Sequence, residues 1–275
     1  MMAAFTNIVL GDLTAPVETE GTVFVGGSYY GGATVNPRDL APVDFGGGGK
    51  GTFFVGGDVV GNPNVDHGDA IVGGAATGTV NTNDGDLFTG VAGIPVADMR
   101  AAMLELSDRL ALLPDTGGTA HLSDNNNLSF DAVADATGLA VFNVGSDWLN
   151  VAGTFKGVFA APGVTTVINV SGTNITIRPN ANDTFTDVVF NFFEAENIQL
   201  NVAFNYSILA PRAHINLQGG GVNGTVVSAS MQQGAEIRPA NFTGTLPGPD
   251  TTPVPLPAAA PLLLGALGLT GWMAR

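Results

Sequence analysis

The sequence repeats one short phrase with small changes, as Thr22-Val-Phe-Val-Gly-Gly27, Thr52-Phe-Phe-Val-Gly-Gly57 and Ala70-Ile-Val-Gly-Gly74. In each phrase, β-branched or aromatic residues run into a glycine pair, which is typical of a short strand that ends at a tight corner. Glycine takes such a corner at low steric cost because it has no Cβ. We therefore predict short strands and corners from residue 1 to about residue 90, interrupted by a flexible loop over residues 35–50.

Residues 95–113 change to the period of a helix. The apolar residues that recur at steps of four and three are Met99, Met103, Leu106, Leu110 and Leu113. This spacing places them on one face of a helix, and Pro114 ends it. We predict one amphipathic helix here.

Residues 120–245 return to short strands. Their centres are expected near residues 168, 176, 190, 206, 216 and 227. Short strands at even spacing indicate a sandwich, a barrel or a stacked solenoid. The 39 glycines favour a solenoid, because every coil needs corners and stacks its aliphatic side chains on the next coil. The prediction for residues 1–245 is an all-β fold, a β-solenoid, with a sandwich as the alternative.

Charge and cysteine content exclude several classes of function. Nine basic residues stand against 24 acidic ones, which gives a formal net charge of −15. Such a chain is poorly suited to nucleic acid, where phosphate neutralisation dominates affinity. The chain has no cysteine, so it has no disulfide framework, no cysteine-based metal site and no thiol chemistry.

The C-terminal part of the chain carries no charge from Ala258 to Met273. It follows a proline-rich stretch at residues 246–257, which we predict to be an extended linker. We predict a transmembrane helix over residues 258–275, although a full span takes roughly 20 residues, and a buried core helix is the alternative. The residues expected to anchor this helix are Leu262, Leu263, Leu264, Leu267, Leu269, Trp272 and Arg275.

The motif before this apolar run is Val254-Pro255-Leu256-Pro257-Ala258. It resembles the VPLPA variant of the PEP-CTERM sorting signals of Gram-negative bacteria. The resemblance implies a surface or secreted protein that an exosortase processes. The chain ends with Arg275 alone, where that family usually has several arginines. No secretory signal is visible at the N-terminus, and we expect the true start to be missing or misplaced.

The order of motifs in residues 5–237 resembles the choice-of-anchor A domain of bacterial surface proteins. Besides the glycine-pair phrases and the helix, the motifs are Asn7-Ile-Val-Leu-Gly-Asp-Leu13, Leu139-Ala-Val-Phe-Asn-Val144, Val167-Ile-Asn-Val-Ser-Gly172, Val188-Val-Phe-Asn-Phe192, Ser207-Ile-Leu-Ala-Pro211 and Val222-Asn-Gly-Thr-Val-Val227. This resemblance implies a surface location without a defined activity. The pattern is similar, more distantly, to bacterial ice-binding proteins. That second resemblance implies a right-handed triangular β-helix in which N-terminal coils, a helix alongside and the remaining coils follow one another.

The titratable residues form no recognisable catalytic or metal-binding motif. His67, His121 and His214 lack metal-ligand spacing, and His214 is expected to point outward from a strand. Glu194 and Glu196 are expected to share a strand face as part of a solvated acidic turn, with a weak calcium site as the alternative. We predict no catalytic residue, no metal and no cofactor.

Candidate ligand-binding side chains are few. The sequence has local Thr-x-Thr motifs at residues 77–79 and 184–186, but they do not recur in every coil as an ice-binding face would require. We expect Tyr29, Tyr30 and Trp148 to be exposed and able to stack on sugars. Three aromatic residues are expected in the core: Phe190, Phe192 and Phe204.

Together these patterns predict a non-enzymatic surface or secreted protein with a structural or adhesive role in a Gram-negative bacterium. Its expected partners are the membrane, through the C-terminal helix, an exosortase, and an extracellular polysaccharide or surface. One alternative is a module that binds ice or polysaccharide. The other is a carbohydrate-active enzyme on a β-helix, which requires two or three carboxylates in one groove.

Overall fold

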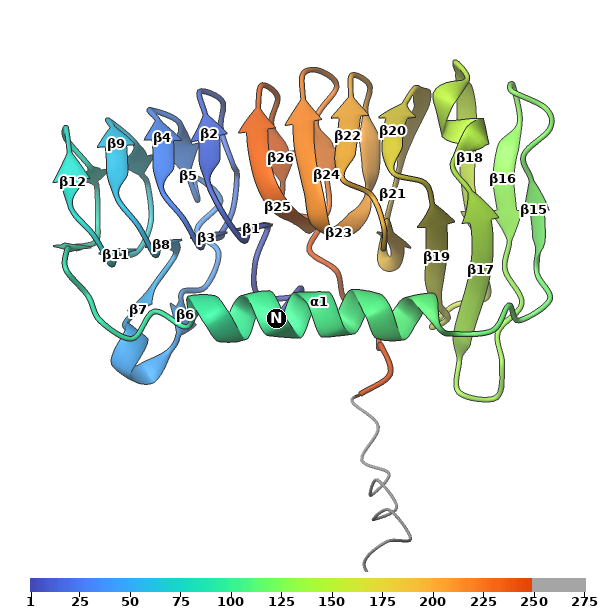
Figure 1. The fold of residues 1–275 in the computed structure, drawn as a ribbon, viewed down its shortest axis with the longest axis horizontal. Helices are drawn as coiled ribbons and strands as arrows, with labels where there is room; N and C mark the ends of the chain where they lie inside the picture. The colour runs from blue at the N-terminus through green and yellow to red at the C-terminus, as the bar shows by residue number, and fades with distance from the viewer. Residues whose placement is uncertain (249–275) are drawn as a thin grey trace, which may run out of the picture.

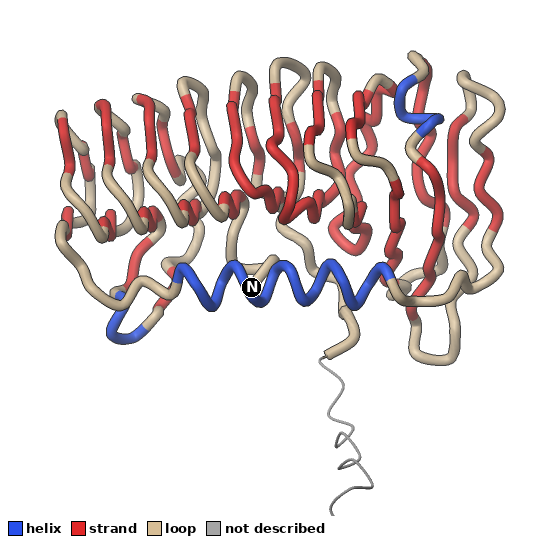
Figure 2. The backbone as a smooth tube through the Cα atoms, in the orientation of Figure 1, coloured by secondary structure: helices blue, strands red, loops and turns tan. Residues whose placement is uncertain are grey.

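The computed structural model describes residues 1–248, which form a long stack of strands with one helix running beside it (Figure 1). The all-β class is confirmed. The helix α1 (Val96–Ala111) lies within the predicted residues 95–113. It passes along one side of the stack for much of its length (Figure 2).

The N-terminal coils stack in three parallel ladders, which the chain visits in turn. The first ladder contains β1 (Asn7–Val9), β3 (Val23–Val25), β8 (Phe53–Val55), β11 (Ala70–Val72) and β14 (Leu87–Phe88). The second contains β2 (Leu13–Ala15), β4 (Tyr29–Gly31), β9 (Val59–Gly61) and β12 (Ala76–Thr77). The third contains β5 (Thr34–Val35), β10 (Asn64–Val65) and β13 (Asn81–Thr82).

The repeated phrases lie on β3, β8 and β11, directly above one another. Val23 pairs with Phe53, and Phe53 pairs with Ala70. The glycine that follows each strand is required by the close stacking of the corners. A Cβ at Gly56 or at Gly73 would lie only 2.5 Å from the carbonyl oxygen of the corner below it. The strand-and-corner prediction for these phrases is confirmed.

The segment predicted as a flexible loop contains an antiparallel pair. β6 (Val43–Asp44) pairs with β7 (Lys50–Gly51) across a short 3-10 helix, Gly46–Gly48. The loop prediction was wrong because a glycine-rich run is read from sequence as a loss of structure, whereas here the glycines form the tip of a hairpin.

The remaining coils begin at the far end of the stack, beyond the end of α1. An antiparallel pair and a long series of parallel strands follow in this order: β15 (Thr119–His121), β16 (Leu128–Asp131), β17 (Leu139–Gly145), β18 (Gly153–Phe159), β19 (Thr165–Ser171), β20 (Asn174–Ile177), β21 (Pro179–Asn191), β22 (Asn197–Leu200), β23 (Phe204–Leu217), β24 (Val222–Asn223), β25 (Val226–Gln233) and β26 (Ile237–Arg238). A short 3-10 helix, Asp147–Asn150, follows β17.

The two series of coils meet in the middle of the stack. β1 pairs with β3 on one side and with β25 on the other, and β2 pairs with β4 and β25. The predicted order, in which N-terminal strands, a helix alongside and the remaining strands follow one another, is therefore confirmed (Figure 1). The strands expected near residues 206 and 216 are one continuous strand, β23, which takes part in the first ladder at Ile208 and in the second at Ile215.

The core has two layers. The inside of the stack holds a column of aliphatic and aromatic side chains, among them Val170 and Phe190, which are fully buried. A second layer lies between the outer side of the first ladder and α1, where Phe24 and Phe54 pack with Met99 and Met103. The predicted core residues Phe190, Phe192 and Phe204 are confirmed.

Two of the three aromatic residues expected at the surface are buried. Tyr29 is 1% exposed and Trp148 is 6% exposed. The Tyr29 ring packs edge-on against Phe53, and its hydroxyl donates to the carbonyl oxygen of Ala15 at 3.2 Å. Trp148 packs on Phe130. The prediction of an exposed Tyr29 failed because Tyr29 and Tyr30 are adjacent on one strand, so only one of them can point outward.

Within residues 1–248, no helix is long and apolar enough to cross a membrane. The predicted transmembrane helix at residues 258–275 and the motif Val254–Ala258 lie outside the described residues.

Candidate binding face

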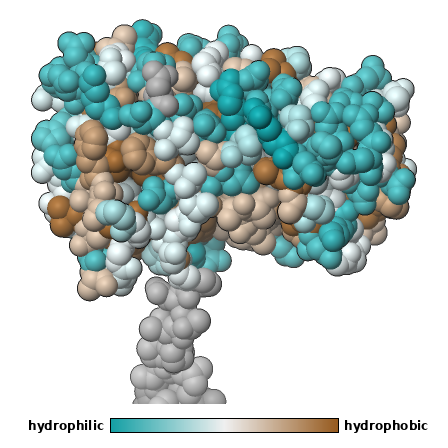
Figure 3. All heavy atoms as spheres, turned by 180° about the vertical axis from the view of Figure 1, so that it is seen from behind, coloured by the Kyte–Doolittle hydropathy of each residue, from teal (hydrophilic) through white to brown (hydrophobic). Residues whose placement is uncertain are grey.

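The outer sides of the three ladders differ in what covers them. α1 covers the first ladder, and its residues Met99, Met103 and Leu110 are buried there. The second ladder carries side chains that are open to solvent, such as Tyr30 and Val60, which are 41% and 40% exposed. Hydrophilic residues cover much of the upper part of the stack when it is seen from behind (Figure 3). The second and third ladders are therefore the faces to compare as binding surfaces.

The second ladder carries one continuous line of outward-pointing residues, which we call the outer column. In register order along the stack, the outer column consists of Thr176, Gln199, Asn216, Gln232, Thr14, Tyr30, Val60 and Thr77. The residues before them on the same strands, such as Ile175, Leu13 and Val59, are buried, as strand alternation requires. Neighbouring members are about 4.8 Å apart along the stack.

Side-chain amides in the outer column are linked to one another and to their neighbours. Asn216 Nδ2 donates to Gln199 Oε1 at 2.8 Å, and Gln199 Nε2 donates to Asn201 Oδ1 at 2.7 Å. Gln218 Nε2 donates to Asn216 Oδ1 at 3.0 Å. A primary amide has two N–H groups and two acceptor lone pairs. These bonds fix the side chains and leave part of their hydrogen-bonding capacity for a ligand.

A second polar line flanks these amides. Asn197 Nδ2 donates to Asn174 Oδ1 at 2.9 Å, and His214 Nδ1 lies 2.8 Å from Ser230 Oγ. His214 is exposed, so its predicted outward orientation is confirmed. The two lines border an open depression of about 320 Å³ that Asn197, His214 and Asn216 help to line. The arrangement suits a ligand with hydroxyl groups.

The N-terminal half of the second ladder is less polar at its centre. Tyr30 pairs with Val60 in register. Two aspartates flank this half, and their carboxylates accept hydrogen bonds from the backbone: Asp12 Oδ1 from Ser28 N and Asp58 Oδ1 from Ala75 N, both at 2.8 Å. The predicted exposure of Tyr30 is confirmed.

The third ladder has a different surface, with charged groups next to one another. Arg38 Nε lies 2.8 Å from Glu20 Oε2, and Arg238 pairs with Glu236. Partial burial, followed by the nearby carboxylates of Glu20 and Glu236, raises the pKa of Glu18 above its ordinary value. This face is acidic, and two of its carboxylates, Glu20 and Glu236, are paired with arginines.

The remaining titratable groups are spread over the stack. His67 Nδ1 lies 2.7 Å from Asp84 Oδ2, and this hydrogen bond raises the pKa of His67 and lowers that of Asp84. His121 Nε2 lies 2.9 Å from Asp131 Oδ2 at the other end. Across residues 1–248, the structure contains no group of three or more His, Asp or Glu side chains that could hold a metal ion.

Glu194 and Glu196 do not share a strand face. They lie in the turn between β21 and β22, and Glu194 Oε1 accepts a hydrogen bond from Gly172 N at 2.7 Å. The strand prediction failed because the alternation that ends at Asn191 does not continue into the turn. The turn itself is acidic and exposed, as expected.

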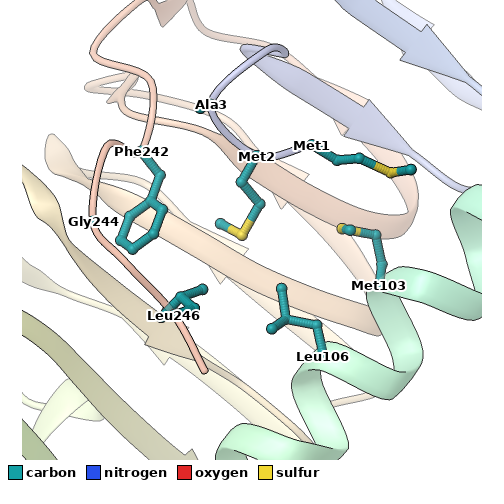
Figure 4. Close-up of a pocket in the computed structure, with 8 residues that line it drawn as sticks. All are labelled: Met1, Met2, Ala3, Met103, Leu106, Phe242, Gly244 and Leu246. Atoms are coloured by element: carbon teal, nitrogen blue, oxygen red, sulfur yellow. The ribbon is translucent and has the colours of Figure 1, made fainter. Parts of the chain in front are cut away.

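An apolar pocket of about 230 Å³ lies where the N-terminal segment, α1 and the C-terminal end of the described chain meet (Figure 4). Its lining side chains are Met1, Met2, Ala3, Met103, Leu106, Phe242 and Leu246, with Gly244. No titratable or hydroxyl side chain lines it. The side chains that line the pocket therefore offer no group for acid–base or nucleophilic chemistry.

The stacked parallel ladders and their uncovered polar face can be compared with known families. The model of the family described as "Putative Ice-binding-like adhesive domain" matches residues 1–239. The chain belongs to this family, which is a family of adhesive domains and not of enzymes. The match supports the more distant resemblance to ice-binding proteins; it gives no support to choice-of-anchor A or to a PEP-CTERM signal. No curated protein and no solved structure matches the chain.

Proposed function

We propose that the protein is a non-enzymatic adhesion module that works at the cell surface or outside the cell. The observation that carries this proposal is the outer column, an uncovered line of uncharged side chains along the second ladder. Membership of an adhesive family supports it. A flat face of this length suits a polymer or an extended surface better than a small substrate.

We further infer that the three ladders form a right-handed triangular β-solenoid over residues 1–245. The register of the ladders supports this inference, since three successive N-terminal coils, β3–β4–β5, β8–β9–β10 and β11–β12–β13, contribute one strand to each of the three ladders. A crystal structure of the full chain would test it. A left-handed course between successive coils, or a gap along one of the three edges, would contradict it.

The C-terminal part is proposed to deliver the domain to the surface. Residues 246–257 would be the linker and residues 258–275 the membrane helix. Val254–Ala258 would be the motif that an exosortase recognises. The support for this is the sequence alone, with its charge-free run from Ala258 to Met273.

Deletion of residues 254–275 tests the delivery step. In the producing bacterium, the full chain is expected in the envelope fraction and the deleted chain in the medium. The matched control replaces the same residues with a polar sequence of equal length. Identical fractionation of full and deleted chains would rule out anchoring while leaving the adhesive role open.

Adhesion itself is tested by removing the gene and restoring it. Cells without the protein are expected to attach less to a polysaccharide-coated surface, and restoration of the full chain is expected to restore attachment. Equal attachment of both strains on all coatings would contradict the adhesive role.

Ice binding is the second candidate, because the family is described as ice-binding-like. The outer column gives it limited support, since its threonines Thr176, Thr14 and Thr77 are separated by amides, Tyr30 and Val60. A measurement of thermal hysteresis with the full chain separates the two candidates. A clear freezing-point depression would place ice ahead of other surfaces.

A further inference from the structure

We propose that the outer column binds one chain of a neutral, hydroxyl-rich polysaccharide that lies along the stack. In this arrangement the amides of Gln199, Asn216 and Gln232 bond sugar hydroxyls, and Tyr30 stacks on a sugar ring. The inference rests on the proposed adhesive function and adds the face and the chemical class of its ligand.

The amides of the outer column are ordered and keep hydrogen-bonding capacity for a ligand. Gln199 and Asn216 are bonded to each other and to Asn201 and Gln218, so their rotamers are held before a ligand arrives. Ordering side chains at an interface costs free energy, and side chains that are already ordered avoid most of that cost. Each amide keeps donor or acceptor sites that its internal bonds do not use. Sugar hydroxyls, which both donate and accept, match such a mixed row.

The outer column is uncharged although the protein is acidic. The chain carries a formal charge of −15, yet every position of the outer column is uncharged. The nearest aspartates on the N-terminal half, Asp12 and Asp58, use a carboxylate oxygen in a backbone hydrogen bond. An acidic polymer would be repelled by the protein as a whole. A neutral polymer meets no such repulsion along this line.

Tyr30 adds an exposed aromatic ring to the outer column. Tyr30 is 41% exposed and lies between Thr14 and Val60 in register. An aromatic ring offers a large apolar surface with a polar tip, which suits the C–H face of a sugar together with its hydroxyls. Ice presents no such apolar face. The combination of one ring with a row of amides therefore favours polysaccharide over ice.

The test uses the purified full chain in native gels that contain a soluble polysaccharide. The neutral probes are hydroxyethyl cellulose, dextran and galactomannan, and the acidic probe is alginate. At least one neutral probe is expected to retard the protein. The double variant Gln199→Ala/Asn216→Ala is expected to weaken that binding by on the order of tenfold. Tyr30→Ala is expected to weaken it about fivefold, whereas Tyr30→Phe keeps the ring and most of the binding.

The matched control lies on the third ladder. Asn81 Nδ2 donates to Asn64 Oδ1 at 2.6 Å and Asn83 Nδ2 to Asp66 Oδ1 at 2.7 Å, so these amides are also exposed and internally bonded. Asn81→Ala/Asn83→Ala is expected to leave binding unchanged. Thermal melting of each variant verifies folding. If the Gln199→Ala/Asn216→Ala variant melts early, Gln199→Glu, which keeps the side-chain size, takes its place.

Several outcomes would overturn the inference. They are retardation by alginate alone, no retardation by any neutral probe, equal loss in the third-ladder control, and thermal hysteresis abolished by the outer-column variants. Cell attachment distinguishes this failure from failure of the proposed function. If restored cells attach normally with the outer-column variants, the protein is an adhesin that uses another face.

Discussion

The two ends of α1 rest on different surfaces of the same ladder. The N-terminal coils present an apolar bed made of Ile8, Phe24, Phe54 and Ile71, which packs with the helix methionines. The later coils present a row of asparagines, Asn191, Asn169 and Asn143, which pair in register across β21, β19 and β17. Hydrophobic burial supports the helix along its length, since Leu110 belongs to the same buried cluster as Val167 and Val189. The asparagine row adds hydrogen bonds at the C-terminal end.

The asparagine row donates side-chain hydrogen bonds to carbonyl groups in and after the last turns of α1. Here Asn191 Nδ2 donates to the carbonyl oxygen of Ser107 at 2.9 Å and Asn169 Nδ2 to that of Leu110 at 2.8 Å. Asn143 Nδ2 donates to the carbonyl oxygen of Leu113 at 3.1 Å. The Leu110 carbonyl oxygen also accepts the backbone N–H of Leu113 at 3.1 Å, so the asparagines add to the backbone hydrogen bonds and tie the helix end to the sheet.

The largest expected effect concerns the residue beside this row. Val170 follows Asn169 but points into the stack and is fully buried. Val170→Asp would place an unpaired charge there and should lower the free energy of unfolding by on the order of 4 kcal/mol or more. Chemical denaturation of the full chain measures this. An unchanged midpoint would mean that the inward and outward sides of β19 are exchanged.

A substitution in the apolar bed should lower the free energy of unfolding slightly less than Val170→Asp. Phe54 is fully buried and contacts Phe5 and Phe45 edge-on. Phe54→Ala should lower the free energy of unfolding by about 3–5 kcal/mol, through lost burial and the cavity that remains. The control is Phe88→Ala in the same ladder, at a side chain that is 45% exposed. Similar losses for both would show that the bed does not support the helix.

Breaking the asparagine row should have a smaller effect. Asn169→Ala removes the donor to Leu110 and the link to Asn191, and should cost about 1–3 kcal/mol. Asn143→Ala is the matched control at an exposed position of the same row and should cost less. Hydrogen exchange of the last turn of α1 gives a local measurement. Protection that stays the same in Asn169→Ala would argue against hydrogen bonding as the support of this end.

The smallest effect concerns pH and the N-terminal coils. Asp84 raises the pKa of His67 above its ordinary value of 6.5, so protonated His67 stabilises the fold below that pH. The contribution is lost as the pH rises through the folded-state pKa. The lowered pKa of Asp84 adds stability that disappears only on strong acidification. The melting temperature should fall slightly as the pH rises above 6.5, and Asp84→Asn should abolish this dependence on pH. If the dependence persists in Asp84→Asn, it comes from groups other than the His67–Asp84 pair.

The sequence predicted those parts of the fold that depend on local patterns. The glycine pairs located β3, β8 and β11, and the spacing from Met99 to Leu113 located α1. The continuity of β23 and the joining of β1 to β25 depend on contacts between residues far apart in the chain. No local window contains that information, so the stacking order came only from a family resemblance.

The candidate face was only partly predictable. Tyr30 and Thr77 were singled out, but the amides Gln199, Asn216 and Gln232 were not, because single polar residues on strands look like ordinary surface. The asparagine row has a clearer pattern in the sequence. Asn143, Asn169 and Asn191 each follow a large apolar residue, at Phe142, Ile168 and Phe190.

The position of β1 between β3 and β25 has a consequence for biosynthesis. One edge of the first strand stays unpaired until residues 226–228 have been made, because those residues are its neighbours. An unpaired strand edge is a template for wrong association. A nascent chain that stalls before this point exposes that edge, so interrupted synthesis or transport should yield aggregates instead of half-sized folded stacks.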